Sequence, residues 1–353
     1  TRCSRDWSSD VCSSDLDITE IMVNGYNNIF IEKNGRITRW NRAFESEEKL
    51  ADIAQRIAAL SNKIINESTP IVDTRLPDGS RVNMVLPPIA IDGPVITIRK
   101  FYKTPMNIGR MIQLGSITEE AAEYLNMLVK ARYNIFISGG TGSGKTTFLN
   151  ALSNYIPKDE RILTIEDSAE LQIAGVDNLV RLEVRRANME GDNEVTIRDL
   201  IKSSLRMRPD RIIVGETRGE EALDMLQAMG TGHDGSLSTG HANSPKDMLV
   251  RLRTMVLMGM SMPAEAIDRQ IASAIDIVVH LKRMRDRTRK VVEITEVGDY
   301  GEDGFELIPL FSFVEEGEDE SGKIIGKLKK TEARLKNTGK FLSYIGGSAA
   351  KQA

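Results

Sequence analysis

One eight-residue motif, GGTGSGKT at positions 139–146, constrains the fold of this chain more than any other feature. It matches the phosphate-binding pattern G-x-x-x-x-G-K-[ST]. It follows the apolar segment NIFIS directly and precedes KTTFLNALSNYI, which has helical periodicity. Glycines let the backbone turn tightly and direct several N–H groups at phosphate oxygens, and the following helix adds the partial positive charge of its N-terminus. The motif therefore predicts a buried strand, a phosphate-binding loop and a helix, in that order.

The same pattern assigns roles within the loop. Lys145 is expected to reach the β and γ phosphates, and Thr146 is expected to offer its hydroxyl to magnesium. The cofactors predicted from the motif are therefore ATP and Mg²⁺. The expected nucleotide-binding residues are Gly139, Gly140, Thr141, Gly142, Ser143, Gly144, Lys145, Thr146 and Thr147.

Two further apolar segments end in acidic residues. They are RILTIED, which contains Glu166, and RIIVGE, which ends at Glu216. Ligands of α/β sheets gather at the carboxyl ends of the strands, so both carboxylates are expected near the phosphates. Each is a candidate ligand of Mg²⁺ or a candidate base that orients the attacking water. Which of the two is the main base stays open, and a solvated acid at a strand end is the plainer alternative for either.

The chain has three histidines, and two of them lie in the segment TGHDGSLSTGHANSP, residues 231–245. This segment is polar and rich in glycine, so we expect a loop outside the core. His241 is the candidate sensor of the γ-phosphate, because a histidine there can pass a change of nucleotide state to neighbouring elements. For His233 an ordinary loop position is an equally good interpretation. His280 ends an apolar strand, and packing explains it better than chemistry.

The chain divides by pattern into a smaller and a larger domain. From residue 134 onward strands alternate with helices, which predicts an α/β fold with a mostly parallel sheet covered on both faces. Residues 17–103 instead read as short strands and one helix, a small α+β domain. We expect a linker at 104–116, the phosphate-binding domain at 117–313 and a C-terminal tail at 314–353.

Local signals mark elements within these domains. In IMVNGYNNIFIEKNGRITRW we expect two strands that meet at a turn of Asn34 and Gly35, and a second hairpin is expected around Asp78 and Gly79. A helix is expected over 47–66 with Ser46 as its N-cap, and another helix is expected to be capped by Thr118. Residues 255–262, MVLMGMSM, are dense in methionine and read as adaptable core filling or, alternatively, as a pliable subunit contact.

The first sixteen residues do not fit either domain. They have neither helical nor strand periodicity and lack the apolar centre of a signal peptide. They hold both cysteines, Cys3 and Cys12. We interpret residues 1–16 as a non-native or disordered tail and expect native sequence from about Asp17. A body without cysteine argues against a disulfide framework and against a cysteine zinc site.

Composition narrows the possible partners. The formal net charge is −4 and aromatic residues make up 5%, so no global basic field or stacking platform for nucleic acid is present in the sequence. No apolar run approaches the roughly 20 residues that span a bilayer. We therefore expect no direct nucleic-acid binding, no transmembrane segment, and a cytoplasmic location with membrane attachment through partners.

The ordered segments GGTGSGKT, TIEDSAEL, SLRMRPDRIIVGETRG and TGHDGSLSTGHANSP resemble the secretion ATPases of type II, type IV and pilus systems. Those families name the segments Walker A, Asp box, Walker B and His box. Within the superfamily the chain looks most like the CpaF-type branch, which serves Tad (tight adherence) pili. The type II secretion and pilus-extension branches typically carry a four-cysteine zinc module, so they are disfavoured, and the conjugation-type branch is nearer.

The resemblance implies a RecA-like P-loop core preceded by a PAS-like N-terminal domain. Carried over by motif, Glu216 is the Walker B acid, Glu166 is the Asp-box acid and candidate general base, and His241 is the His-box residue. Relatives often have a bulky apolar residue where this chain has Gly240, so we expect a looser turn there. Pilus extension versus retraction, the pilin and the membrane partner are not decided by the sequence.

Arginines are expected to stabilise the transferring phosphoryl group. The resemblance places arginines of the N-terminal domain over the nucleotide, so Arg81 and Arg99 lead. It also implies a homo-hexamer that works with a polytopic inner-membrane platform protein. The remaining candidates are Arg75, Arg206, Arg208 and Arg218.

Three functions compete. The leading one is an ATP-hydrolysing motor of a Tad or type IV pilus or a type II/IV secretion system, in which hydrolysis drives domain motion in a ring. The second is a conjugation-type or DNA-translocating ATPase, which predicts stimulation by nucleic acid with a steep salt dependence. The third is a nucleotide-gated binding protein that hydrolyses almost nothing.

Overall fold

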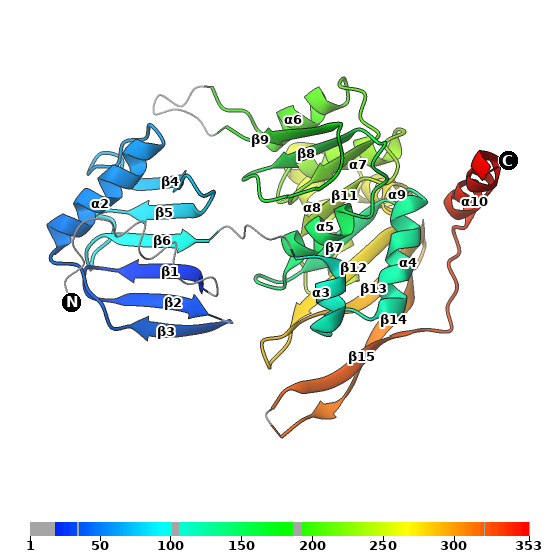
Figure 1. The fold of residues 1–353 in the computed structure, drawn as a ribbon. Helices are drawn as coiled ribbons and strands as arrows, with labels where there is room; N and C mark the ends of the chain where they lie inside the picture. The colour runs from blue at the N-terminus through cyan, green and yellow to red at the C-terminus, as the bar shows by residue number, and fades with distance from the viewer. Residues whose placement is uncertain (1–17, 34, 101–105, 186–192, 321, 353) are drawn as a thin grey trace. The chain divides into compact units, whose positions relative to one another are not determined.

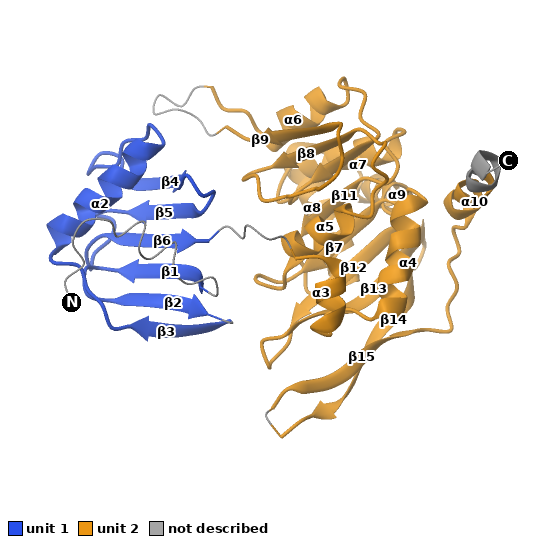
Figure 2. Ribbon diagram, in the orientation of Figure 1, with its two compact units in different colours: residues 1–104 blue, residues 105–353 orange. Residues whose placement is uncertain are grey.

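The computed structural model describes residues 18–33, 35–100, 106–185, 193–320 and 322–352 (Figure 1). The chain forms two compact units, Thr1–Thr104 and Pro105–Ala353 (Figure 2). The first unit contains a smaller α+β fold and the second contains a large, mostly parallel sheet, so the predicted fold class is confirmed. The predicted tail at residues 1–16 lies outside the described residues.

The first unit is a six-stranded antiparallel sheet in the order β3-β2-β1-β6-β5-β4, with one face packed on helix α2 (Glu47–Leu60). Alternate strand residues such as Ile21 and Val23 point into the core, where they meet Leu50 and Ile57 of the helix. The strands are β1 (Ile18–Asn24), β2 (Ile29–Lys33), β3 (Arg36–Trp40), β4 (Ile71–Arg75), β5 (Arg81–Val85) and β6 (Val95–Arg99).

Two expectations for this unit are wrong in detail. The segment expected to hold two strands contains parts of three, because a turn at residues 25–28 separates β1 from β2. Helix α2 ends at Leu60 rather than at residue 66. Asn62 adopts a left-handed φ of 54°, and the N–H groups of Asn62 and Lys63 bond to carbonyls of the last turn. That arrangement is a Schellman motif, which stops a helix.

The other local predictions for this unit are confirmed. Ser46 is the N-cap of α2 and accepts a hydrogen bond from the N–H of Lys49. Strands β4 and β5 form the hairpin expected around residues 78 and 79. Strands β2 and β3 pair up to the two residues that flank the expected turn at 34 and 35, although Asn34 itself lies outside the described residues.

The second unit is built on a nine-stranded sheet in the order β15-β14-β13-β12-β7-β11-β10-β8-β9. The six strands from β12 to β9 are parallel, and β12 to β15 are joined in antiparallel fashion. The strands are β7 (Ile135–Gly139), β8 (Ile162–Glu166), β9 (Leu179–Glu183), β10 (Arg211–Val214), β11 (Leu237–Gly240), β12 (Ile277–Arg283), β13 (Arg289–Gly301), β14 (Gly304–Glu318) and β15 (Ile324–Lys330).

Helices cover both faces of this sheet, as the strand–helix alternation predicted. In β7 the side chains of Ile135 and Ile137 enter a core shared with α4 and α5, and Phe136 enters the opposite core, shared with α7, α8 and α9. The helices are α3 (Ile108–Gln113), α4 (Glu119–Lys130), α5 (Lys145–Ser153), α6 (Ile197–Ser204), α7 (Glu221–Gly230), α8 (Pro245–Gly259), α9 (Ala264–Ala274) and α10 (Gly339–Gln352).

The expected linker at 104–116 and tail at 314–353 are corrected by the structure. Helix α3 lies inside the linker range, and its Ile108 and Met111 are buried in the core with α4 and α5. Strand β15 lies inside the tail range and pairs with β14 along the edge of the large sheet. Both segments mix apolar residues with glycine and polar or charged residues, so neither has a clear period. Ile324 and Leu328 of β15 are buried, whereas Ile325 of the same strand is exposed.

Strand β11 was not predicted, because its sequence LSTG lies inside the segment expected to be an outer loop. It runs between β7 and β10, and its residues Leu237, Ser238, Thr239 and Gly240 are all buried. Their small size suits a strand flanked on both sides, and the hydroxyls have partners. The expectation that residues 231–245 lie outside the core is therefore wrong for this part.

Thr118 occupies the N-cap position of α4 but makes no capping hydrogen bond. Its hydroxyl instead donates to the carbonyl of Leu328, 3.3 Å away. The helix start was predicted correctly and the capping bond was not, because β15 offers the hydroxyl a competing acceptor.

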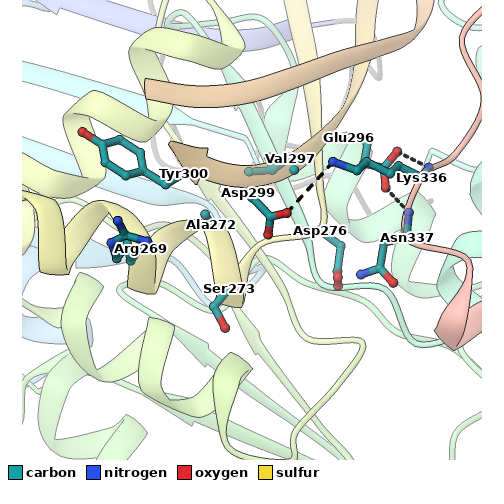
Figure 3. A pocket seen from close by; sticks show the side chains of 11 residues that line it. Arg269, Ala272, Ser273, Asp276, Glu296, Val297, Asp299, Tyr300, Lys336 and Asn337 are labelled. Atoms are coloured by element: carbon teal, nitrogen blue, oxygen red, sulfur yellow. Dashed lines mark hydrogen bonds and ion pairs between the residues drawn. The ribbon is translucent and has the colours of Figure 1, made fainter. Parts of the chain in front are cut away.

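The C-terminal segment returns to the amino ends of the parallel strands. The buried carboxylate of Glu296 accepts hydrogen bonds of 2.7 Å from the backbone N–H groups of Lys336 and Asn337 (Figure 3). Lys340 at the start of α10 lies 2.7 Å from the carboxylates of Asp234 and Asp276. A cavity of about 620 Å³ opens beside this segment. It lies near the amino end of β12, whereas the phosphate-binding motif follows the carboxyl end of β7. No helix among the described residues is long and apolar enough to cross a membrane.

Candidate nucleotide-binding site

The motif at 139–146 forms the predicted strand, loop and helix. The loop follows β7, and α5 begins at Lys145. Gly144 precedes the helix with a left-handed φ of 92°, a conformation that strains other residues. Gly139 lies against the carbonyl of Leu281 in β12, and a side chain at this position would collide with it. The backbone can therefore form a cradle here only with glycine at these positions.

The carbonyl of Gly140 organises the inside of the loop. It accepts hydrogen bonds from the hydroxyl of Ser143 at 2.8 Å and from Nζ of Lys145 at 3.1 Å. Outside the loop, Nε of Arg289 donates to the carbonyl of Gly142 at 2.9 Å. Arg289 was not among the predicted site residues, although it lies in the basic run KRMRDRTRK at 282–290. Only the return of β13 beside β12 brings it to the loop.

Lys145, His241 and Glu216 meet at the carboxyl ends of β7, β11 and β10. Nζ of Lys145 lies 3.2 Å from Nδ1 of His241, and Nε2 of His241 lies 2.7 Å from Oε1 of Glu216. An ammonium can only donate, so Nδ1 accepts and the proton of the neutral ring is assigned to Nε2, facing the carboxylate. Burial, and then the charge of Lys145, lower the pKa of His241, in agreement with a neutral ring.

Each carboxylate oxygen of Glu216 has a close neighbour, but only Oε2 is hydrogen-bonded among the described residues. Oε2 accepts a hydrogen bond of 2.6 Å from the guanidinium of Arg218. The contact of Oε1 with His241 is close but not well aligned as a hydrogen bond, so this buried oxygen keeps unused acceptor capacity. Arg218 also lies 3.9 Å from a carboxylate oxygen of Asp167. These contacts form a chain from Lys145 of the loop to acidic residues at the ends of two strands.

Glu166 ends β8 and is only 2% exposed. Its Oε2 accepts hydrogen bonds from the N–H groups of Glu170 and Leu171, at 2.7 and 2.9 Å. Its Oε1 is buried and has no hydrogen-bond partner within the described part of the chain. Burial raises the pKa of Glu166, and the two backbone hydrogen bonds oppose this effect. The backbone of the loop after β8 thus bonds to Oε2 of Glu166, and Oε1 can still accept a bond from another group.

These residues fit a magnesium-bound nucleotide. Buried carboxylate oxygens with unused acceptor capacity, on Glu166 and Glu216, are the hard ligands that Mg²⁺ prefers. Among the described residues no group of three or more histidine, cysteine or acidic side chains forms a ready metal cage. Magnesium commonly binds through one or two carboxylates together with substrate phosphates, so the donor set suits an ion that arrives with its nucleotide.

Hydroxyl groups tie the Glu216 segment to the His241 segment. Thr217 bonds to Ser238 through their hydroxyls at 2.9 Å, and Thr239 donates to the carbonyl of Gly215 at 2.8 Å. Thr217, Ser238 and Thr239 are all buried. These links could not be predicted from the sequence, because the hydroxyls find each other only when β10 and β11 lie side by side. They fix the two functional side chains relative to each other.

Comparison with known proteins decides the family. The family model described as type II/IV secretion system protein matches residues 11–315. The chain belongs to the type II/IV secretion system protein family.

Similar curated proteins include the conjugal transfer protein TrbB of Rhizobium radiobacter, 34% identical over 82% of this chain and 87% of the relative. The type IV secretion system protein VirB11 of Brucella suis is also 34% identical, over 76% of this chain and 81% of the relative. Among solved structures, the Legionella pneumophila ATPase DotB shares the fold with a TM-score of 0.56 at 24% identity, over 78% of this chain and 76% of that chain.

The remaining candidate histidine and arginines of the second unit lie at opposite ends of the parallel strands. His233, Arg206 and Arg208 precede β11 or β10, so they lie at the amino ends of the parallel strands, away from the phosphate-binding loop. Within this chain they therefore do not approach the loop, and any role of theirs toward a nucleotide stays a prediction. Arg218 follows β10 and contacts the site.

His280 lies beneath the loop rather than in it. It pairs with Ser138 across β12 and β7, and its Nδ1 lies 2.8 Å from the serine hydroxyl. Both residues are buried, as the packing interpretation expected.

The expectation that Gly240 loosens a turn is wrong. Gly240 is the last residue of β11 and pairs with Ser138, so it lies in a strand. The space that a side chain would need is filled by Met248 and Phe136.

Arg81 and Arg99 belong to the first unit, where they pair across β5 and β6. Arg75 pairs with Arg81 on the other side, and Arg99 lies 3.7 Å from Glu20. The four residues form one row across the sheet. Their expected approach to the phosphates stays a prediction, as do the nucleotide contacts of the nine loop residues and the magnesium contacts of Thr146, Glu166 and Glu216.

The methionine-dense segment divides between the two interpretations. Met255 is buried in the core of the second unit, and Met258 is 67% exposed beside a cavity of about 430 Å³. Core filling explains the first residue and not the second.

Proposed function

We propose that this chain is a magnesium-dependent ATPase that acts as the motor of a Tad or type IV pilus or a type II/IV secretion system. The observation that carries the proposal is the meeting of Lys145, His241 and Glu216 beside the glycine loop. His241 lies 3.2 Å from Lys145 on one side and 2.7 Å from Glu216 on the other. A loop of this type binds phosphates, and the neighbouring carboxylates suit magnesium and an attacking water. Membership of the secretion-system family supports the same function.

Each residue then has a defined task. Lys145 neutralises charge on the β and γ phosphates, and Thr146 turns its hydroxyl toward the metal. Glu216 and Glu166 hold the metal or orient the attacking water, and which of them is the main base stays open. His241 senses the γ-phosphate. Mg²⁺, when bound, supplies positive charge that stabilises the phosphate oxygens during transfer.

Two substitutions test this proposal. Lys145→Ala should abolish ATP turnover, because the loop loses the only cation that the motif supplies to the phosphates. Glu216→Gln should keep nucleotide binding and reduce hydrolysis by about a hundredfold or more, in the range typical of lost acid–base catalysis. Phosphate release and fluorescent-ADP binding measure the two properties separately. Unchanged turnover in either variant contradicts the assignment, and full turnover in Glu216→Gln also excludes that residue as base.

We further propose that the motor is a homo-hexameric ring in which Arg81 and Arg99 reach the nucleotide of their own or a neighbouring subunit. An arginine brought by a movable unit makes hydrolysis depend on the position of that unit, which is the physical requirement of a motor. Mass photometry with an ATP analogue and Mg²⁺ should show six-subunit particles, whereas monomers alone contradict the ring.

The branch of the family is the finer part of the proposal. The quoted motifs favour the Tad pilus, with the protein in the cytoplasm and docked on a polytopic inner-membrane platform protein. The names of relatives such as TrbB and VirB11 favour the conjugation-type alternative. Acidic pI and few aromatic residues argue against direct nucleic-acid binding.

A gene deletion in the source organism distinguishes the two branches. Loss of surface pili with intact DNA transfer supports the pilus motor, and the reverse supports the conjugation-type ATPase. Stimulation of ATP turnover by single- or double-stranded DNA, with a steep loss at higher salt, is expected only for a DNA-translocating enzyme.

A further inference from the structure

We propose that His241 and Arg218 are displaceable partners, which hold Lys145 and Glu216 in a self-paired arrangement that a magnesium-bound nucleoside phosphate opens when it binds. The inference rests on the proposed function and adds a form of regulation to the same site.

The first half of the arrangement concerns Lys145. Its ammonium bonds to the carbonyl of Gly140 and contacts Nδ1 of His241. The lysine is 7% exposed, so few other positions are open to it without moving these partners. A bound phosphate needs the same ammonium, and it must therefore compete with His241.

The second half concerns Glu216. One carboxylate oxygen is bonded to Arg218 and the other faces His241. A metal ion that binds Glu216 needs one of these oxygens, so Mg²⁺ must compete with a guanidinium or with an imidazole. A phosphate that binds Lys145 thus competes with His241. A metal ion that binds Glu216 competes with Arg218 at one oxygen and with His241 at the other.

Arg218 has room to leave. Its side chain is 59% exposed, and it lines a cavity of about 430 Å³ beside helix α8. Asp247 and Arg251 line the same cavity. Release of Arg218 from Glu216 therefore requires no repacking of the core, and Asp247 offers it a second carboxylate.

The test is the affinity for ADP, measured with and without Mg²⁺ by isothermal titration calorimetry on the full chain. ADP has no γ-phosphate, so any direct contact of His241 with that group does not enter the measurement. Arg218→Ala should bind MgADP about fivefold more tightly, as expected from the loss of one competing hydrogen bond, and should bind metal-free ADP as the wild type does. If Arg218 acted only through its positive charge, its removal would weaken the binding of MgADP, because ADP is an anion.

Two substitutions at position 241 separate its two contacts. His241→Gln keeps a donor near the position of Nε2 and loses the acceptor for Lys145, so metal-free ADP should bind about fivefold more tightly. His241→Asn keeps an acceptor near Nδ1 and loses the reach to Glu216, so only MgADP should gain. Arg251→Ala is the matched control, since Arg251 makes no hydrogen bond or ion pair within the described residues. It should leave both affinities unchanged or slightly weaker.

Failure of this inference can be distinguished from failure of the proposed function. If the wild type binds no ADP, or Lys145→Ala binds it equally well, the proposed function fails. If the wild type binds ADP through Lys145 but the Arg218 and His241 variants bind it with unchanged or weaker affinity, only the displacement is overturned. Circular dichroism of each variant confirms that the fold is retained before the affinities are compared.

Discussion

The side chain of Asn134 joins four segments just before β7. Its Oδ1 accepts hydrogen bonds from the N–H groups of Gly235 and Ser236, and its Nδ2 donates to the carbonyls of Met229 and Ala274. The residue is 1% exposed, so these backbone groups have no easy access to water if the amide is lost. Asn134 thus secures the entry to β11 and the ends of α7 and α9.

Asn134→Ala should therefore lower the free energy of unfolding by about 3 kcal/mol, because buried donors and acceptors lose their partners. Chemical denaturation followed by circular dichroism measures the change. Asn126→Ala is a matched control on α4, where the side-chain oxygen has no hydrogen-bond partner. It should change stability by less than about 0.5 kcal/mol, in line with substitutions that remove no network. Equal effects of the two substitutions contradict the network role of Asn134.

At the scale of elements, the C-terminal segment completes the second unit rather than trailing from it. Burial raises the pKa of Asp276, and the charge of Lys340 acts in the opposite direction. Lys340 lies on α10, and Asp276 lies just before β12. One ion pair thus holds the last helix to the amino end of the sheet and keeps a buried carboxylate neutralised.

Lys340→Met should lower the free energy of unfolding by about 2 kcal/mol at neutral pH, because it leaves a buried charge without its partner. Without Lys340 the folded-state pKa of Asp276 rises further above its ordinary value of 3.8. An acid with a raised folded pKa stabilises the fold at low pH, and that contribution is lost as the pH rises through the folded value. The deficit of the variant should therefore be smaller at about pH 5 than at about pH 7.5.

Urea denaturation at the two pH values measures this difference. Lys336→Met makes the same substitution in the same segment, but at an exposed pair with Glu306. It should cost much less stability than Lys340→Met at either pH, because water and salt screen an exposed pair. A deficit in Lys340→Met that does not depend on pH would falsify the role given to Asp276.

At the scale of the whole molecule, the two units carry different parts of the proposed chemistry. The second unit holds the loop, the carboxylates and His241, and the first holds the row of Arg75, Arg81 and Arg99 on adjacent strands. A cationic row of this kind attracts anions. The proposed motor needs that row only during hydrolysis.

Arg81→Ala and Arg99→Ala should each lower kcat for ATP by tenfold or more while the affinity for ADP stays within about twofold, because a supplied arginine acts on the transition state. Steady-state turnover and ADP titration measure the two effects. Arg39→Ala is a control on the same sheet, where the side chain bonds to Asn28 near the β3 edge. If all three variants retain wild-type turnover, the arginine assignment is wrong.

The sequence by itself determined the strand, loop and helix around the phosphate-binding motif. The signals that predict them are local, since the glycines, the helix start and the apolar strand all lie within about twenty residues. The hairpins of the first unit and the N-cap at Ser46 were predictable for the same reason.

Only the tertiary structure decided the neighbours of that loop. Lys145 and His241 are 96 positions apart, and Arg289 reaches Gly142 across 147. Strand β11 and the hydroxyl links of Thr217 exist because small polar residues become buried between strands that the sheet order places beside them. No local pattern encodes such burial, because the partners that satisfy these groups are supplied by distant parts of the chain.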